Sequence, residues 1–217
     1  MSWLRLPRSQ IPGYRGSDSA RLQAAVAAGL LCCVGCSTEE RQTPAPVAPN
    51  VVLISIDTLR ADHMSLYGYR RPTTPFLEQL AREAVVFDDF VYGGGGTLPS
   101  HMTMMTSLYP AAHGVDVSNR TPLRPHHQTL AEALREAGHS TAAFVDAGWM
   151  LGRFGFAQGF DLYDQRGGRF AEILPRAFEW LHHNHDRPFF LFLHTYDTHA
   201  EWKRLPYACP DGFDELY

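Results

Sequence analysis

The sequence predicts an α/β domain built on a largely parallel sheet sandwiched by helices, and three observations lead to this prediction. Two apolar runs, at 51–56 and 188–194, are continuous rather than alternating, which is typical of strands buried on both faces. A third short run, at 141–146, has a similar character. Amphipathic helical patterns separate these runs, and strands that alternate with helices indicate an α/β architecture.

The elements after the first strand are predicted from local signals. A helix is expected at 74–84. Pro75 suits its first turn, and apolar residues recur at helical spacing along one face. A second strand is expected at 85–92, because this run is rich in Val and Phe. A further helical pattern follows at 99–108.

Two more helices complete the pattern. Thr129 and Glu132 have the spacing of a capping box, and Gly138 would close the helix that they open. An amphipathic stretch at 170–181 predicts a long helix, kinked or restarted at Pro175. A length of 217 residues with 45% hydrophobic content is enough for one such domain with a real core.

The composition excludes one broad class of partner. The formal net charge is −4 and the chain has no run of basic residues, so nucleic-acid binding is not expected. Three of the four cysteines lie within 32–36, and only Cys209 lies in the body of the chain. A disulfide framework is therefore not expected either.

The start of the chain has the character of an export and tethering segment. Residues 1–36 combine a basic beginning with an uncharged apolar run at 24–35 and then small residues, as in a secretory signal. The sequence around Cys36 resembles a bacterial lipobox, which predicts lipidation of Cys36; an ordinary cleaved signal and an uncleaved anchor are the alternatives. Residues 37–49 are typical of a Pro-rich tether, so the folded domain is expected at 50–217.

Polar residues follow the predicted strands, at the edge where parallel sheets form their sites. Asp57 directly follows the first strand, Asp146 ends the 141–146 strand, and His194, Asp197 and His199 lie at the end of the last one. A carboxylate at the position of Asp57 needs a partner, because an unpaired buried charge costs several kcal/mol. A metal ion or an arginine would serve, and capping of the next turn is the alternative. Arg60 is either a ligand for an anion or a surface cation.

Four glycines, at 93–96, lead into Thr97, and Pro99 follows two residues later. Threonine is a good N-cap and proline a good early helix residue, so a helix is expected to begin here. Two interpretations of Thr97 remain open at this point. Its hydroxyl either only caps the helix, or it lies at the positive helix end where an anionic group can be held, with the glycines allowing close approach.

Several ordered motifs within 49–207 together resemble the amino-terminal part of the sulfatase family, in the alkaline phosphatase superfamily. They read PNVVLISIDTLRADHMSLYGY, TTPFLEQLAREAVVFDDFVY and TLPSHMTMMTSLYPAAHGV. The resemblance implies that Asp57 is a metal ligand and that Thr97 is both the nucleophile and a metal ligand. It also implies that His199 and His101, the latter in place of the family's arginine, contact the anion. The implied cofactor is a divalent metal ion: calcium, manganese or zinc.

Two departures from the family pattern shape the expected chemistry. Sulfatases convert a Cys or Ser to formylglycine at the nucleophile position, and the β-methyl group of Thr97 prevents this conversion. Thr97 would instead act as a metal-activated alkoxide and form a covalent ester that water breaks, which favours phosphorus over sulfur. The late Asp-His or Asp-Asn motif of the family does not occur before Tyr217, which predicts a domain truncated at its carboxyl end.

The sequence thus predicts a hydrolase of the bacterial cell envelope, lipid-anchored or periplasmic, that acts through Thr97. The substrate class would be a small-molecule, glycan or lipid ester of sulfate or phosphate. The alternative is a truncated or degenerate family member without catalysis. The histidines at 182, 183 and 185 are expected to be solvated near a helix end.

Overall fold

The computed structural model describes residues 48–118 and 120–199. The predicted signal segment with its candidate lipidation site Cys36 lies outside these residues, as do nearly all of the predicted tether and Cys209. Within the described ranges, no helix is both long enough and apolar enough to cross a membrane.

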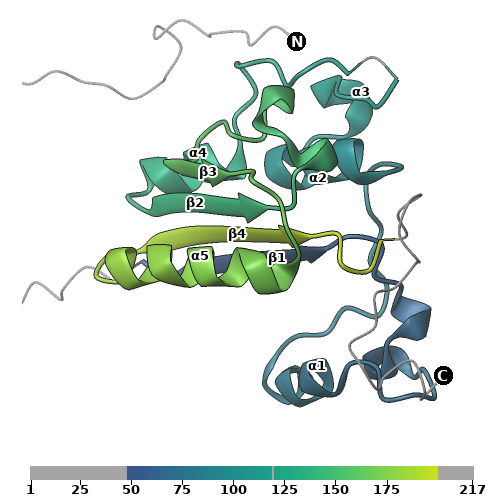
Figure 1. The fold of residues 1–217 in the computed structure, drawn as a ribbon. Coiled ribbons are helices and arrows are strands. Elements are labelled where there is room, and N and C mark those ends of the chain that lie inside the picture. The colour runs from purple at the N-terminus through teal and green to yellow at the C-terminus, as the bar shows by residue number, and fades with distance from the viewer. Residues whose placement is uncertain (1–47, 119, 200–217) are drawn as a thin grey trace, which may run out of the picture. The chain divides into compact units, whose positions relative to one another are not determined.

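A four-stranded parallel sheet forms the centre of the domain. Its strands are β1 (Val51–Ile56), β2 (Ser140–Val145), β3 (Leu162–Asp164) and β4 (Phe189–Thr195), in the spatial order β1-β4-β2-β3. Every neighbouring pair is parallel, so the carboxyl ends of all four strands lie at the same edge (Figure 1). The predicted α/β class with a largely parallel sheet is confirmed.

Helices cover both faces of the sheet, as predicted. α2 (Thr97–Thr106) and α4 (Leu130–Glu136) pack on one face, in a buried cluster that includes Phe190 of β4. α5 (Phe170–Asn184) packs on the opposite face, where Leu191 of β4 is buried (Figure 1). Successive residues of β4 thus enter different apolar clusters, which explains why its sequence is continuously apolar.

The remaining helical elements are short. α1 (Pro75–Leu80) and α3 (Pro110–His113) both begin with proline at the first helical position, where its missing N–H has no intrahelical role. Single 3₁₀ turns lie at Ala61–His63, Ser65–Tyr67, Ala81–Glu83, Gly148–Met150 and Gly152–Phe154.

The predicted capping box is confirmed. Thr129 Oγ1 accepts a hydrogen bond from the Glu132 N–H at 3.1 Å, and Glu132 Oε2 accepts one from the Thr129 N–H at 2.9 Å. Gly138 follows α4 with a φ of +91°, a conformation that glycine adopts without strain. These contacts set the two ends of α4.

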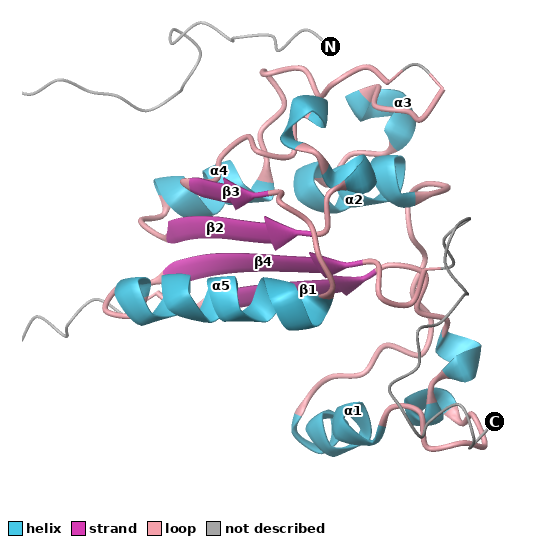
Figure 2. Cartoon of the chain, in the orientation of Figure 1, coloured by secondary structure: helices cyan, strands magenta, loops and turns pink. Residues whose placement is uncertain are grey.

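The strand expected at 85–92 is absent from the described structure. Most of the segment between α1 and α2 is loop (Figure 2), and its large apolar side chains are exposed, with Phe90 at 79% and Val91 at 93%. A β-rich run becomes a strand only where a neighbouring strand offers hydrogen bonds, and no described strand pairs with this segment.

The structure adds one strand that was not predicted, and it contradicts a restart of the long helix at Pro175. β3 was not predicted, because a strand of three residues is too short to show a pattern. α5 runs through Pro175 without a break. Ile173 and Ala177, on either side of the proline, are buried against the sheet, and this packing offsets the one backbone hydrogen bond that Pro175 cannot make.

Candidate active site at the carboxyl edge of the sheet

Three elements bring polar side chains together at the carboxyl edge of the sheet. Asp57 directly follows β1, Thr97 is the first residue of α2, and His194 is the penultimate residue of β4. β1 and β4 are neighbours, with Ser55 opposite His194. The sheet register therefore places these chemistry-bearing residues at one edge, although they are far apart in the sequence.

The hydroxyl of Thr97 is hydrogen-bonded to Asp57. Thr97 Oγ1 donates to Asp57 Oδ2 at 2.6 Å, a distance typical of a charge-assisted bond. Gly96 is the N-cap of α2, and no side chain caps this helix end. The interpretation of Thr97 as a helix cap is therefore wrong. Its hydroxyl lies at the positive end of α2, beside a carboxylate.

The glycines before Thr97 meet two separate requirements. A Cβ on Gly93 would lie 2.6 Å from Cγ2 of Thr103 on α2, so the loop can pass this close only with glycine. Gly96 has a φ of +85°, which side chains disfavour. A Cβ on Gly96 would meet no atom of the described residues within 4 Å, so the space before α2 is open on this side.

Asp57 is a half-buried carboxylate whose neighbours favour its ionised form. Burial alone would raise the pKa of Asp57, but contacts with His194, Thr97 and His101 outweigh burial, and the net pKa lies below the usual 3.8. Its backbone N–H donates to the Thr195 carbonyl at 3.0 Å. Asp57 is therefore charged at neutral pH and fixed in position beside β4.

His101 lies one turn into α2 and is only 5% exposed. Its Nδ1 is 2.8 Å from the carbonyl oxygen of Thr97, and its Nε2 is 2.8 Å from Ser55 Oγ. Burial lowers the pKa of His101, with the nearby His194 acting in the same direction. The anion contact expected of His101 stays a prediction, and the structure shows a buried ring that is hydrogen-bonded to Thr97 and Ser55.

His194 received no role from the sequence, although it ends an apolar strand. The side chain is fully buried, and neither ring nitrogen has a hydrogen-bond partner among the described residues. Its Nε2 lies 3.7 Å from Asp57 Oδ2, which is longer than a hydrogen bond. The signal that could have found it is the histidine itself, since a polar residue in a strand buried on both faces needs a partner.

Asp57, His101 and His194 fit a bound metal ion. One ligand atom from each residue lies within 4.8 Å of the other two. Carboxylate oxygens and imidazole nitrogens are common ligands of divalent metals. A cation between them would also satisfy one of the two ring nitrogens of His194, neither of which has a hydrogen-bond partner among the described residues.

The segment after β4 lines the same region. The Tyr196 ring lies edge-on to His194, with centroids 4.6 Å apart, and 5.5 Å from the ring of His199. Burial raises the pKa of Tyr196 to about 12, although a hydrogen bond with Thr97 acts in the opposite direction. The His199 N–H donates to the Tyr196 carbonyl at 2.7 Å. His199 is thus held near Thr97 through Tyr196, on an exposed turn.

Arg60 is hydrogen-bonded to Asp62. Its guanidinium bonds both carboxylate oxygens of Asp62, at 2.9 and 2.5 Å, and its side chain is 68% exposed. The interpretation of Arg60 as a surface cation agrees with this placement.

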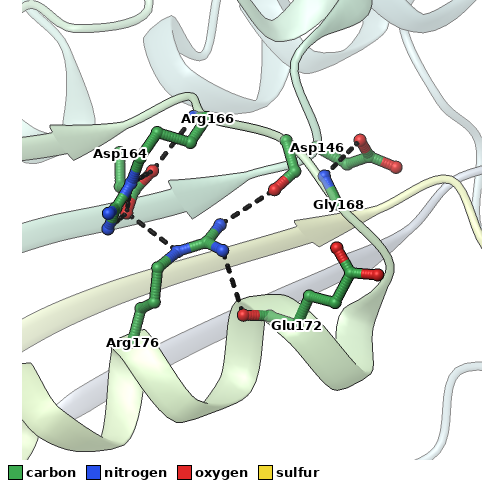
Figure 3. Close-up of polar contacts among 7 residues, drawn as sticks. Asp146, Asp164, Arg166, Gly168, Glu172 and Arg176 are labelled. Atoms are coloured by element: carbon green, nitrogen blue, oxygen red, sulfur yellow. Dashed lines mark hydrogen bonds and ion pairs between the residues drawn. The ribbon is translucent and has the colours of Figure 1, made fainter.

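A second polar cluster holds the loop between β3 and α5 (Figure 3). Asp164 is 6% exposed and accepts hydrogen bonds from the side chains of Arg166 and Arg176. Arg176 also donates to the backbone carbonyls of Gly167 and Glu172. This cluster fixes the loop that passes Asp146 at the end of β2, where the Gly168 N–H donates to Asp146 Oδ1 at 3.3 Å.

The assignment of the chain rests on its match to a family of known proteins. The family model described as Sulfatase matches residues 49–217, which is most of the chain. The chain belongs to the sulfatase family. This assignment confirms the resemblance seen in the motifs around Asp57 and Thr97, and it places the chain in the alkaline phosphatase superfamily.

Individual members of the sulfatase family match parts of the chain. Steryl-sulfatase of Mus musculus is 31% identical over 141 residues, which are 60% of this chain and 22% of that protein. N-acetylglucosamine-6-O-sulfatase of Bacteroides thetaiotaomicron is 22% identical over an alignment that covers 94% of this chain and 39% of that protein. The chain therefore spans less than half the length of these curated relatives.

Solved structures support the fold of the sulfatase-family domain. Phosphonate monoester hydrolase of Agrobacterium radiobacter matches with a TM-score of 0.63 at 20% identity, over 78% of this chain and 44% of that one. At this identity the similarity concerns the fold alone. The parallel sheet with helices on both faces is thus an arrangement that this chain shares with it.

Proposed function

We propose that this chain carries the nucleophile and part of the metal site of a metal-dependent ester hydrolase, with Thr97 as the nucleophile. The observation that carries the proposal is the 2.6 Å hydrogen bond from Thr97 Oγ1 to Asp57 Oδ2. A hydroxyl that touches an ionised carboxylate at a helix N-terminus is positioned for proton loss, beside a helix end that favours anions.

Asp57 and Thr97 would bind the metal from the side of β1 and α2. A divalent cation there would lower the pKa of the Thr97 hydroxyl and balance the charge that develops on the substrate. Asp57 would also keep the Thr97 hydroxyl in one orientation through their hydrogen bond. His199, on the turn after β4, would contact the oxygens of the anion.

The first chemical step forms one bond and breaks another. Thr97 Oγ1 attacks the phosphorus or sulfur atom, the bond to the ester oxygen breaks, and this oxygen leaves with the electron pair. The alcohol takes up one proton, which balances the proton that Thr97 loses. Water then attacks the threonyl ester in line, which restores the hydroxyl and releases inorganic phosphate or sulfate.

Thr97 favours phosphorus over sulfur. A threonyl ester can be released only by a second attack at the central atom, since threonine cannot provide the second hydroxyl of hydrated formylglycine. Phosphate esters tolerate such a second displacement, as the superfamily's threonine and serine nucleophiles suggest. Arg60 donates to Asp62 through two of the five N–H groups of its guanidinium, and we assign it an auxiliary role in contacting the anion.

The substrate class would be an anionic ester of a glycan, a lipid or a small molecule. The protein BT4656, a solved structure with a TM-score of 0.60 at 21% identity, was determined in complex with its substrate D-glucosamine-2-N,6-O-disulfate. That ligand shows the kind of sugar ester that this fold can accommodate. The export-type beginning of the chain supports an envelope location, with lipidation at Cys36.

The test compares an aryl phosphate monoester, a bis-aryl phosphate and an aryl sulfate as substrates of the full chain with added divalent metal. We expect turnover of a phosphate ester to dominate and Thr97→Ala to abolish it. Ser100→Ala is the matched control, because its hydroxyl lies on the same turn but bonds only backbone carbonyls. Dominant sulfate hydrolysis would refute the preference for phosphorus. Activity retained by Thr97→Ala would refute the nucleophile, and no turnover of any ester would favour the non-catalytic alternative.

The location is tested separately. We expect the Cys36→Ala variant, expressed in a bacterial host, to lose acylation and membrane retention, and we expect globomycin to block processing of the unchanged chain. Processing that globomycin does not affect would contradict lipidation and favour an ordinary signal.

A further inference from the structure

The starting observation is the isolation of His194. This side chain is fully buried, yet neither Nδ1 nor Nε2 has a hydrogen-bond partner within the described part of the chain. A buried polar group without a partner costs free energy, and such groups in native structures have a reason. The side chain contacts the rings of His101 and Tyr196, which offer it no direct hydrogen bond.

The carboxylate of Asp57 is the charged group beside His194, but it does not form a hydrogen bond with the His194 ring. His194 Nε2 and Asp57 Oδ2 are 3.7 Å apart, which leaves a gap rather than a hydrogen bond. His101 lies on the third side, with its ring centroid 5.0 Å from that of His194 and nearly perpendicular to it. One atom from each of the three side chains lies within 4.8 Å of the other two, so they surround a common space.

The hydrogen bonds of His101 orient one of its nitrogens toward Ser55 and the interior. The carbonyl oxygen of Thr97 can only accept, so His101 Nδ1 carries the proton and donates to it. In the neutral ring, Nε2 then presents a lone pair, which at present accepts from the Ser55 hydroxyl at 2.8 Å. A ring nitrogen tied to a backbone carbonyl is the usual way in which proteins orient a histidine that ligates metal through its other nitrogen.

We infer that Asp57, His101 and His194 form a three-ligand site for a divalent transition-metal ion, which prefers zinc to calcium. The inference rests on the proposed metal-dependent function and specifies the ligands and the class of ion. Two imidazole nitrogens and one carboxylate suit zinc, whereas calcium takes six to eight oxygen ligands. Three protein ligands with an open position are typical of catalytic zinc sites. Thr97, which bonds the same oxygen of Asp57, lies next to that position.

The test is isothermal titration calorimetry of the metal-stripped full chain with zinc and with calcium. We expect one zinc ion per site, bound at least about 100-fold more tightly than calcium. We expect His194→Ala to weaken zinc binding by at least the roughly 10- to 100-fold that follows loss of an outer-shell partner. Equal affinities for zinc and calcium, or a zinc affinity unchanged in both His194→Ala and His101→Ala, would overturn the inference.

Two controls separate this site from other histidines. His113→Ala removes a histidine of similar burial whose ring nitrogens already bond Thr103 and Val115, so zinc affinity should not change. A variant with alanine at 182, 183 and 185 removes the histidines at the end of α5, where an adventitious ion could bind. If that triple variant, rather than His194→Ala, loses zinc, the inference is wrong.

A measurement on the unchanged chain covers the case in which a variant does not fold. Two-dimensional ¹H–¹⁵N spectra of the histidine side chains should show zinc-dependent shifts of the ring nitrogens of His101 and His194, and not of His113. Shifts confined to other histidines would overturn the inference. The outcome is independent of catalysis. A chain that binds zinc at these residues but hydrolyses no ester would contradict the proposed function only. A calcium-dependent hydrolase whose zinc affinity is unchanged by His194→Ala would contradict this inference only.

Discussion

Two carboxylates near the carboxyl edge of the sheet have opposite surroundings. Asp164 is satisfied by protein atoms alone: two arginine side chains and the Arg166 N–H donate to it (Figure 3). Asp57 has a single short hydrogen bond, from Thr97, and its Oδ2 lies 3.7 Å from Nε2 of His194, a nitrogen without a hydrogen-bond partner among the described residues. The Asp164 cluster is satisfied without a ligand and holds the β3–α5 loop. The cluster of Asp57 leaves that nitrogen unsatisfied by the described residues and is therefore arranged for a bound ion.

The largest expected difference between Asp57 and Asp164 is the effect on activity when the charge of either carboxylate is removed. We expect Asp57→Asn to reduce ester hydrolysis by on the order of 10³-fold or more, the scale seen when one member of a catalytic unit is lost. Asp164→Asn should leave the activity of the folded protein within about twofold, because its partners are committed to the β3–α5 loop. Steady-state rates of both variants with a saturating metal concentration check this. Similar losses in the two variants would contradict the division between the clusters.

Stability should show the opposite order: Asp164→Asn should destabilise the fold more than Asp57→Asn does. We expect Asp164→Asn to lower the free energy of unfolding by about 1–3 kcal/mol, because it weakens bonds between a buried carboxylate and two guanidinium groups. Asp57→Asn should lower it by less in the absence of metal, because Asp57 is half-buried and accepts one short hydrogen bond, whereas Asp164 is buried and accepts several. Urea unfolding monitored by tryptophan fluorescence measures both. A larger loss of unfolding free energy in Asp57→Asn than in Asp164→Asn would contradict the structural role given to Asp164.

The pH dependence of stability should distinguish Asp164 from a third carboxylate at this edge, Asp146. Hydrogen bonds from Arg166 hold the pKa of Asp164 below its usual 3.8, so this stabilisation is complete above that value and is lost as the pH falls through the folded-state pKa. Burial raises the pKa of Asp146, so its penalty is present at neutral pH and disappears in acid.

Unfolding curves between about pH 5 and about pH 3 test these signs. Relative to the unchanged chain, Asp164→Asn should lose stability less steeply as the pH falls. Asp146→Asn should be the more stable protein at neutral pH, with its advantage shrinking in acid. Parallel curves for all three proteins would show that neither carboxylate has a shifted pKa.

The smallest expected effect concerns Tyr196, which packs between His194 and His199. Its hydroxyl accepts a hydrogen bond from the Trp149 N–H at 3.3 Å and also hydrogen-bonds Thr97, so Tyr196→Phe loses both contacts but keeps the ring. We expect kcat to fall by about 2- to 10-fold, the scale of one neutral hydrogen bond to the nucleophile, with zinc affinity unchanged. Tyr163→Phe, which removes a hydroxyl that donates to the Met150 carbonyl, is the matched control. A loss of zinc affinity in Tyr196→Phe alone would make Tyr196 part of the metal site.

The fold could be predicted because its main strands are buried on both faces. β1 and β4 appear in the sequence as continuous apolar runs, and the capping box of Thr129 is a purely local signal. The 85–92 run failed as a strand because pairing depends on a neighbour that local composition does not reveal. β3 is formed mainly by its pairing with β2, so its three residues carry no signal of their own.

The candidate site could be predicted only in part. Local pattern left Thr97 as a helix cap or a functional hydroxyl, and its role became visible only through Asp57, forty positions earlier in the chain. His194 had no local signal beyond its polarity, because its isolation results from the register of β4 beside β1. His101 was expected to contact an anion, and its hydrogen bond to the Thr97 carbonyl became apparent only in the folded chain.

The most direct test of the account is to locate a metal at the cluster of Asp57. Crystals of the full chain grown with zinc should give an anomalous difference peak bounded by Asp57, His101 and His194, next to Thr97. The same peak should be missing from crystals of His194→Ala. A peak confined to the histidines at 182, 183 and 185, or a Thr97 region without any peak at saturating zinc, would contradict the claim that these residues are arranged around a metal ion.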